Sequence, residues 1–252
     1  MMRPMAHHDA LTLPGADVGR LKHARFVALP LGSVEYHGPH APLGVDTTLA
    51  TGFARALAER ADGVALPAIA YSFTSTLTSA RPGTLSVGAE PFLAYLREVL
   101  AALARQGVTR IVALNAHSEN QHALRLAAET VATAHPAVSA LLVDWWKLAE
   151  ADDAPTFTEA GGHGHGGPVE VSTTAAFDPR GVLAASAPDI AYEAPWWRGA
   201  AQVVGAGQSP RGFDGYHGRV SEIDAVAGRA LRDAVLERLE RLVHDWLVRA
   251  EG

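Results

Sequence analysis

Short apolar runs rich in β-branched residues alternate along this chain with longer amphipathic runs, and this alternation constrains the fold more than any other feature. It is typical of a mostly parallel sheet whose faces are covered by helices, so the expected fold class is α/β. The predicted strands span 26–30, 64–69, 110–114 and 138–144, and the predicted helices span 48–61, 91–106, 121–135 and 224–250.

The length and composition indicate one folded unit. The chain has 252 residues, 48% of them hydrophobic, which is enough for one full core. Glycine and proline fall in short clusters between the periodic stretches, and no low-complexity linker separates two halves. We therefore expect a single domain over residues 1–252.

Charge and hydropathy exclude several classes of partner. The net charge is -6 and the basic residues are scattered singly, so we expect no nucleic acid partner. The first eight residues lack the apolar core of a signal peptide, and no run approaches the roughly 20 apolar residues of a membrane span. We expect a cytoplasmic protein without a membrane partner. Because the chain has no cysteine, any metal must be held by histidine and carboxylate.

The first polar segment, 31–46, follows the first predicted strand and reads Leu-Gly-Ser-Val-Glu-Tyr-His-Gly-Pro-His-Ala-Pro-Leu-Gly-Val-Asp. Glu35 and Asp46 are the only formal charges in residues 26–54. An unpaired carboxylate beside a core strand is costly unless a cation or hydrogen bonds compensate it. Glu35 and His37 are two positions apart, which in extended backbone points both side chains to the same side. The alternative is a surface turn with incidental charges.

A second segment, 115–122, follows the strand predicted at 110–114 and reads Asn-Ala-His-Ser-Glu-Asn-Gln-His. His117 and Glu119 repeat the spacing of an imidazole and a carboxylate at a strand end. The alternative is a polar helix start, in which Asn120 caps the helix and Glu119 interacts with its dipole.

The third segment, 161–172, reads Gly-Gly-His-Gly-His-Gly-Gly-Pro-Val-Glu-Val-Ser. Glycines around two imidazoles suit a tightly turned or mobile loop that presents a base to substrate, and Glu170 follows Pro168 at an expected helix start. The candidate base is His165. A flexible or metal-binding His/Gly tract is the alternative, and we favour it for His163.

These three segments, together with Arg-Pro-Gly-Thr at 81–84, resemble the creatininase family of amidohydrolases over residues 26–177. The resemblance implies a three-layer α/β/α fold and a homo-oligomer, with a hexamer as a common form. It also implies two divalent ions per subunit, of Zn, Mn or Fe type. The metal ligands that it implies are Glu35, His37, Asp46, His117 and Glu119, with Asp46 as the bridging carboxylate.

The resemblance also assigns catalytic and substrate-binding residues. Glu170 resembles a further ligand or a group beside the ligands, and His165 matches the histidine that carries a proton to the scissile nitrogen. Ser118 and Gly161 stand where creatinine-opening enzymes carry aromatic residues around the substrate, while Trp146 matches another of those aromatics. We therefore expect these three residues to bind substrate, and a substrate other than creatinine.

The chemistry of such a site leads to a hypothesis for its function. Two cations about 3.5 to 4 Å apart lower the pKa of a bridging water and polarise the carbonyl that it attacks. Protonation of the leaving nitrogen by an imidazole adds roughly 100-fold to 10,000-fold. We expect a dinuclear amidohydrolase in which a metal-bridging hydroxide cleaves a C–N bond of a small cyclic amide, lactam or formamide.

Two alternatives to that hypothesis remain: a peptidase of the same family that acts on a short modified peptide, and a non-catalytic metal-binding homologue. The expectation of a homo-oligomer has a second basis in the aromatic-rich stretch 187–221. There Trp196 and Trp197 would expose a large apolar area on a monomer.

Overall fold

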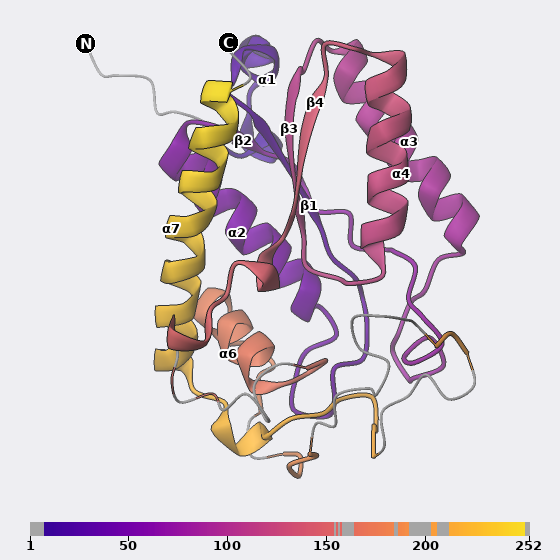
Figure 1. Ribbon diagram of the computed structural model, residues 1–252, viewed down its shortest axis with the longest axis vertical. Coiled ribbons are helices and arrows are strands. Elements are labelled where there is room, and N and C mark those ends of the chain that lie inside the picture. Colours follow the sequence, from indigo (N-terminus) through magenta and orange to yellow (C-terminus); the bar gives the residue numbers. More distant parts are fainter. Residues whose placement is uncertain are drawn as a thin grey trace.

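A parallel β-sheet of four strands lies at the centre of the described part of the chain (Figure 1). The computed structural model describes residues 8–153, 155, 157, 164–183, 186–191, 203–205 and 212–249. The strand order is β2-β1-β3-β4. The strands are β1 (Val27–Leu31), β2 (Val64–Ala65), β3 (Arg110–Asn115) and β4 (Ser139–Asp144).

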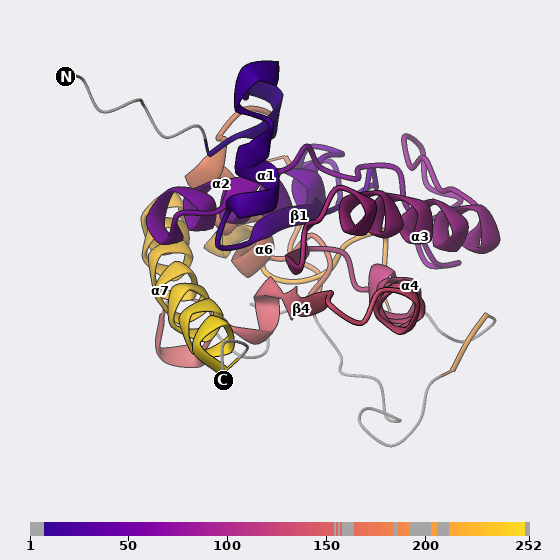
Figure 2. The same cartoon turned by 90° about the horizontal axis from the view of Figure 1, so that it is seen from above.

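Helices cover both faces of this sheet (Figure 2). One face carries α2 (Val45–Ala61), α6 (Pro168–Phe177) and α7 (Ala225–Arg249), and the other carries α3 (Ala89–Arg105) and α4 (Asn120–Ala134). The short helix α1 (Gly19–His23) precedes β1. The three-layer α/β/α fold with a parallel sheet is thus confirmed. No helix in the described ranges is long and apolar enough to cross a membrane.

Alternation of side chains along β1 and β3 divides the core between the two faces. Ala28 and Val112 pack with buried residues of α2 and α7, whereas Val27, Leu29 and Ile111 pack with α3 and α4. Because both strands are buried on both sides, their sequences are continuously apolar, as expected for a parallel sheet.

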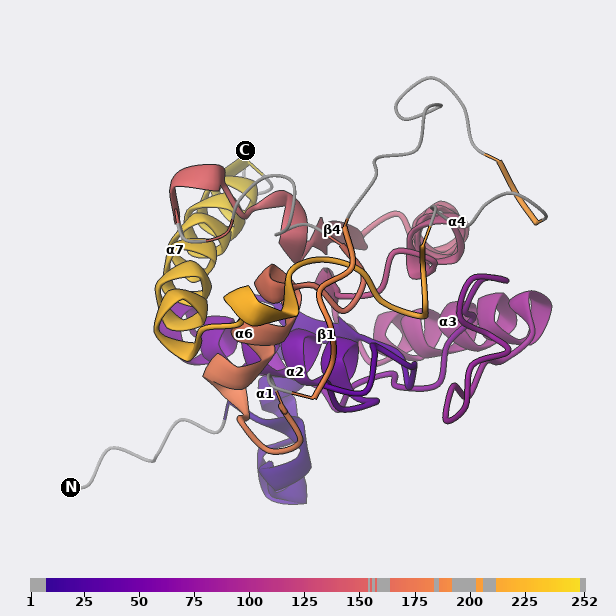
Figure 3. The same cartoon turned by 90° about the horizontal axis from the view of Figure 1, so that it is seen from below.

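The register of the sheet places three strand ends at one level. Leu31 of β1 is opposite Asn115 of β3, which is opposite Asp144 of β4. The segments that follow these strands therefore start side by side, at the end of the sheet where α6 lies (Figure 3). In an open α/β sheet this is the end at which ligands bind.

All eight predicted elements are present, with small differences at their ends. The largest difference is in the predicted strand 64–69, which forms a strand only over Val64–Ala65, with one isolated bridge from Ile69 to Leu31. Pro67 lacks the N–H that would continue the ladder. For α6 the sequence predicts only the start, at Pro168, because the residues of this helix show no clear amphipathic repeat. Trp196 and Trp197, on which the expected homo-oligomer partly depends, lie outside the described residues, as does His163.

The crossing of α6 and α7 gives a first prediction. A Cβ on Gly228 of α7 would lie 2.0 Å from the carbonyl oxygen of Ser172 in α6. Gly228→Ala must therefore push the two helices apart, and we expect it to lower the free energy of unfolding by about 1–3 kcal/mol. Thermal unfolding measures this change.

Gly19→Ala in α1 is the matched control, since its Cβ would meet no atom closer than 3.9 Å. Its unfolding temperature should equal or slightly exceed that of the unchanged protein, because alanine favours helix more than glycine. A Gly228→Ala protein as stable as this control would contradict the packing argument.

Candidate metal centre

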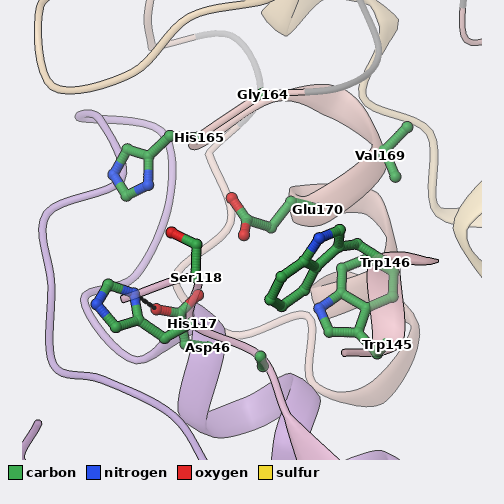
Figure 4. Close-up of a pocket in the computed structure, with 10 residues that line it drawn as sticks. Asp46, His117, Ser118, Trp145, Trp146, Gly164, His165, Val169 and Glu170 are labelled. Atoms are coloured by element: carbon green, nitrogen blue, oxygen red, sulfur yellow. Dashed lines mark ion pairs between the residues drawn. The ribbon is translucent and has the colours of Figure 1, made fainter. Parts of the chain in front are cut away.

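Five polar side chains meet at the carboxyl ends of β1 and β3, and Figure 4 shows part of this cluster. They come from four places in the chain: the segment after β1, the first turn of α2, the segment after β3 and the first turn of α6. Four of the five are buried, and the one from α6 is half-buried. The five are Glu35, His37, Asp46, His117 and Glu170.

Asp46 lies between the two imidazoles. Its Oδ2 is 3.1 Å from Nδ1 of His117, and its Oδ1 is 3.2 Å from Nε2 of His37. Each imidazole also faces a second carboxylate. Nδ1 of His117 is 3.1 Å from Oε2 of Glu35, and Nε2 of His37 is 3.7 Å from Oε2 of Glu170. Asp46 is therefore shared by two sets of potential ligand atoms.

Within the described residues, three groups of potential ligand atoms each lie within 4.8 Å of one another. The first two share Asp46, and the third adds an imidazole from the glycine-rich segment. The groups are Glu35, Asp46 and His117; His37, Asp46 and Glu170; and Glu35, His37 and His165.

The hydrogen bonds of the two imidazoles support a cation between the groups. Nδ1 of His37 lies 2.9 Å from the carbonyl oxygen of Glu35, and Nε2 of His117 lies 3.0 Å from that of Phe73. Each of these nitrogens donates its hydrogen to the carbonyl, so in a neutral ring the opposite nitrogen points its lone pair at carboxylate oxygens. Such facing acceptors repel one another unless a cation lies between them, and carbonyl-anchored histidine is the usual arrangement around bound metal.

The donor set also fits divalent metal ions. Oε2 of Glu35 and Nε2 of His37 are buried without a hydrogen-bond partner among the described residues. Imidazole nitrogen with carboxylate oxygen suits Zn, Mn and Fe, which need no thiolate ligand. The residues present can therefore hold the ions that the sequence predicts.

Hydroxyl groups orient two of the carboxylates. The Ser33 hydroxyl donates a 2.6 Å hydrogen bond to Oδ2 of Asp46, and the Thr78 hydroxyl donates to Oε1 of Glu35. Neither residue is among the site residues predicted from the sequence. Ser33 lies within the first polar segment, and this position is a signal that could have identified it. Nothing in the sequence near Thr78 indicates its contact with Glu35.

The charges of the cluster shift the pKa values of its members strongly. Burial raises the pKa of Glu35, but nearby imidazoles, His165 foremost, outweigh this effect and hold it at about 2. Burial lowers the pKa of His37, yet Asp46 and then Glu170 raise it to about 10. Burial is the main cause that raises the pKa of Glu170 to about 7. The carboxylates create a negative field in which a metal ion competes with the imidazole protons.

His165 lies against this cluster. Its ring stacks on that of His37 with 4.1 Å between centroids, and its Nε2 lies 2.7 Å from the carbonyl oxygen of Tyr36. Burial, followed by the charge of His37, lowers the pKa of His165 to about 4. The close approach requires glycine at position 166, where φ is +68° and a Cβ would lie 2.5 Å from the carbonyl oxygen of His37.

The structure does not bring Glu119 into the cluster, contrary to the expectation from its spacing with His117. Glu119 precedes the first residue of α4, is half-buried, and lines a separate hollow with Phe73, Glu90 and His122. The expectation assumed extended backbone at the strand end. The chain instead turns into helix directly after His117, with φ -69° and ψ -17° at Glu119, so residues two apart do not share a side.

A cavity of about 210 Å³ adjoins the cluster (Figure 4). Ser118, which is exposed, and Trp146, which is half-buried, both lie on its wall, and their role in substrate binding stays a prediction. Gly161 lies outside the described residues. The residues that line the cavity are Asp46, Ala116, His117, Ser118, Trp145, Trp146, Gly164, His165, Val169 and Glu170.

An α/β/α fold with histidines and carboxylates gathered at the strand ends defines a class of protein suited to hold divalent metal beside a small cavity. The sequence profile of the creatininase family, described as creatinine amidohydrolase, matches residues 11–243. The chain belongs to the creatininase family.

Curated relatives with different activities match parts of the chain. The creatinine amidohydrolase of Pseudomonas putida is 33% identical over 96 residues, which cover 36% of this chain and 37% of that protein. A mycofactocin precursor peptide peptidase of Mycobacterium ulcerans is 34% identical over 171 residues, 62% of this chain and 60% of that protein. The 3-dehydro-scyllo-inosose hydrolase of Thermotoga maritima is 35% identical over 100 residues, 40% of this chain and 32% of that protein. The matches thus span less than two thirds of each relative.

Solved structures share the fold over nearly the whole chain. A crystal structure of creatinine amidohydrolase (creatininase) has a TM-score of 0.82 at 20% identity, covering 96% of this chain and 98% of that one. A Mn form of creatininase has a TM-score of 0.81 at 19% identity, covering 96% and 99%.

The different places of Glu170 and Glu119 give a second prediction. Glu170→Gln removes a negative charge from the group of His37 and Asp46, so the protein should bind divalent metal at least about 10-fold more weakly there. Glu119→Gln is the matched control, and its metal content should equal that of the unchanged protein. Metal analysis after dialysis against graded chelator measures both. The reverse pattern would restore Glu119 as the ligand.

Proposed function

We propose that this protein is a dinuclear metal-dependent amidohydrolase that cleaves a C–N bond of a small cyclic amide, lactam or formamide. The observation that carries the proposal is the position of Asp46 between two groups of ligand atoms at the edge of a small cavity. Membership of the creatininase family supports hydrolysis as the reaction class.

In this proposal each subunit holds two divalent ions, with Asp46 as the shared ligand. Glu35 and His117 complete the first group, and His37 and Glu170 complete the second. Bound there, the ions supply Lewis-acid polarisation of the substrate carbonyl and activation of a water molecule. Mn and Zn-Zn forms of creatininase among the similar structures support ions of this kind. Glu170 acts as a ligand here and not as an independent carrier of protons.

The walls of the cavity restrict the substrate. Trp145 and Trp146 present aromatic surface, against which a planar amide can stack. Among the described lining residues there is no lysine or arginine to pair with a carboxylate. These features favour a compact, uncharged amide.

His165 supplies the proton that the leaving nitrogen needs. Because its Nε2–H donates to the carbonyl of Tyr36, its Nδ1 carries the lone pair of the neutral ring. A lowered pKa keeps the ring neutral near pH 7, so Nδ1 can accept the proton that the attacking water loses and pass it to the departing nitrogen. Stacking on His37 holds the ring at the edge of the ligand cluster.

A peptidase is the second candidate, because the mycobacterial peptide peptidase matches 62% of this chain. A panel of lactams, formamides and short peptides separates the candidates. We expect metal-replete protein to hydrolyse a member of the small-amide set with a kcat/KM at least about 100-fold above that for any peptide. Chelator-treated protein is the control. Faster peptide cleavage would favour the peptidase, and metal binding without any turnover would favour a non-catalytic homologue.

His165→Ala tests the proton carrier. The rate of hydrolysis by this variant should fall by about 100-fold or more on amides with a poor nitrogen leaving group. It should fall by less on activated anilides, whose nitrogen departs without prior protonation. Metal content should stay near that of the unchanged protein, because His165 lies outside the two ligand groups that share Asp46. Equal losses on both substrate types would refute the role, and loss of metal would make His165 a ligand.

A further inference from the structure

A segment far from the ligands in sequence, residues 213–217, packs on the turn that carries His165. The backbone N–H of His217 donates a 3.0 Å hydrogen bond to the carbonyl oxygen of His165. The His217 ring lies directly over the backbone of Gly164, where a Cβ would be 2.8 Å from it. The turn and this segment are therefore in direct contact through both backbone and side chain.

The ring of His165 contacts two other rings. His37 stacks on it at 4.1 Å between centroids, and Phe213 lies 6.1 Å away with its plane tilted by 51°. The distance to Phe213 falls in the range in which aromatic rings attract each other, and the distance to His37 is that of a close stacked contact. His37 is anchored through the carbonyl of Glu35, and Phe213 is the second aromatic ring in contact with His165.

Phe213 is itself held by contacts with His217 and Arg81. Its ring makes an edge contact with that of His217 at 5.7 Å, and the guanidinium of Arg81 lies over it at 6.0 Å. Arg81 also forms a 2.7 Å ion pair with Asp214, the next residue in the chain. Phe213 is half-buried as a result, although it lies in a segment without regular secondary structure.

The same segment also contacts the polar segment after β1. Tyr216 packs its ring edge-on against that of His40 at 4.9 Å, and its Cβ lies 2.8 Å from where a Cβ on Gly166 would be. His40 in turn donates from Nε2 to the carbonyl oxygen of Gly166 at 2.8 Å. Residues 213–217 thus contact both the turn that carries His165 and the polar segment after β1.

We propose that Phe213 is a positioning residue for His165, which it holds against His37 so that the imidazole faces the reacting nitrogen. The inference rests on the proposed function to the extent that His165 carries the proton. Phe213 itself lines no part of the cavity, so its effect must pass through His165.

The test compares Phe213→Ala and Phe213→Tyr in the full-length, metal-replete protein, each with and without His165→Ala. Phe213→Ala should lower kcat on a poor-leaving-group amide by about tenfold, because small displacements of a catalytic group are costly, while KM changes by less than about twofold. Phe213→Tyr keeps the ring and should retain the rate. In the His165→Ala background, Phe213→Ala should cause no further loss. Tyr95→Ala, an exposed aromatic on α3, is the control and should match the unchanged protein.

A second readout needs no substrate. Diethyl pyrocarbonate modifies accessible imidazoles, and peptide mapping by mass spectrometry follows His165 alone. Phe213→Ala should increase the rate of this modification by about tenfold, and Phe213→Tyr should leave it unchanged. A rate that is the same in Phe213→Ala and the unchanged protein overturns the inference, as does an equal loss of kcat in both backgrounds. If no amide is hydrolysed, the proposed function fails, and the modification rate alone decides whether Phe213 positions His165.

Discussion

The mutual repulsion of three carboxylates in a confined space is the constraint on which the rest of this structure depends. Glu35, Asp46 and Glu170 come from separate parts of the chain, and the folded state brings them together at the end of the sheet. Burying even one unpaired carboxylate is costly, so three of them require positive charge among them. Protons on the imidazoles can supply part of that charge, and divalent ions can supply more of it. Ions bound there would therefore stabilise the fold as well as equip the site.

The sheet positions the segments that carry these side chains. Because β1, β3 and β4 end at the same level, the segments that follow them begin side by side. The side chain of Asn115 links two of these ends, because its Nδ2 donates to Asp144 while its Oδ1 accepts from the backbone N–H of His117. Gly32 then allows the start of α2 to approach closely, since a Cβ there would lie 2.5 Å from Thr47. Asp46 reaches the cluster because nothing at position 32 keeps α2 away.

The sequence predicted the parts of this arrangement that depend on local pattern. Continuous apolar runs identified the strands, and the scarcity of charge around Glu35 and Asp46 marked both as unusual. Glu119 lies apart from the cluster because α4 begins one residue later, so its backbone is helical and not extended. Contacts made across long sequence separations left no local signal. The hydroxyl of Thr78 on Glu35 and the packing of Phe213 beside His165 are of this kind, since each joins segments that only the tertiary fold brings together.

The ligand cluster and much of the cavity wall come from different stretches of the chain. The ligands lie after β1 and β3 and in the first turns of α2 and α6, whereas the aromatic wall of Trp145 and Trp146 follows β4. Substitutions in that wall can reshape the cavity without removing any ligand. Over evolutionary time, a lineage with this architecture can therefore exchange one substrate for another while it keeps the side chains of the cluster. The creatinine amidohydrolase, the peptide peptidase and the inosose hydrolase among the relatives illustrate how widely the substrates of related chains diverge.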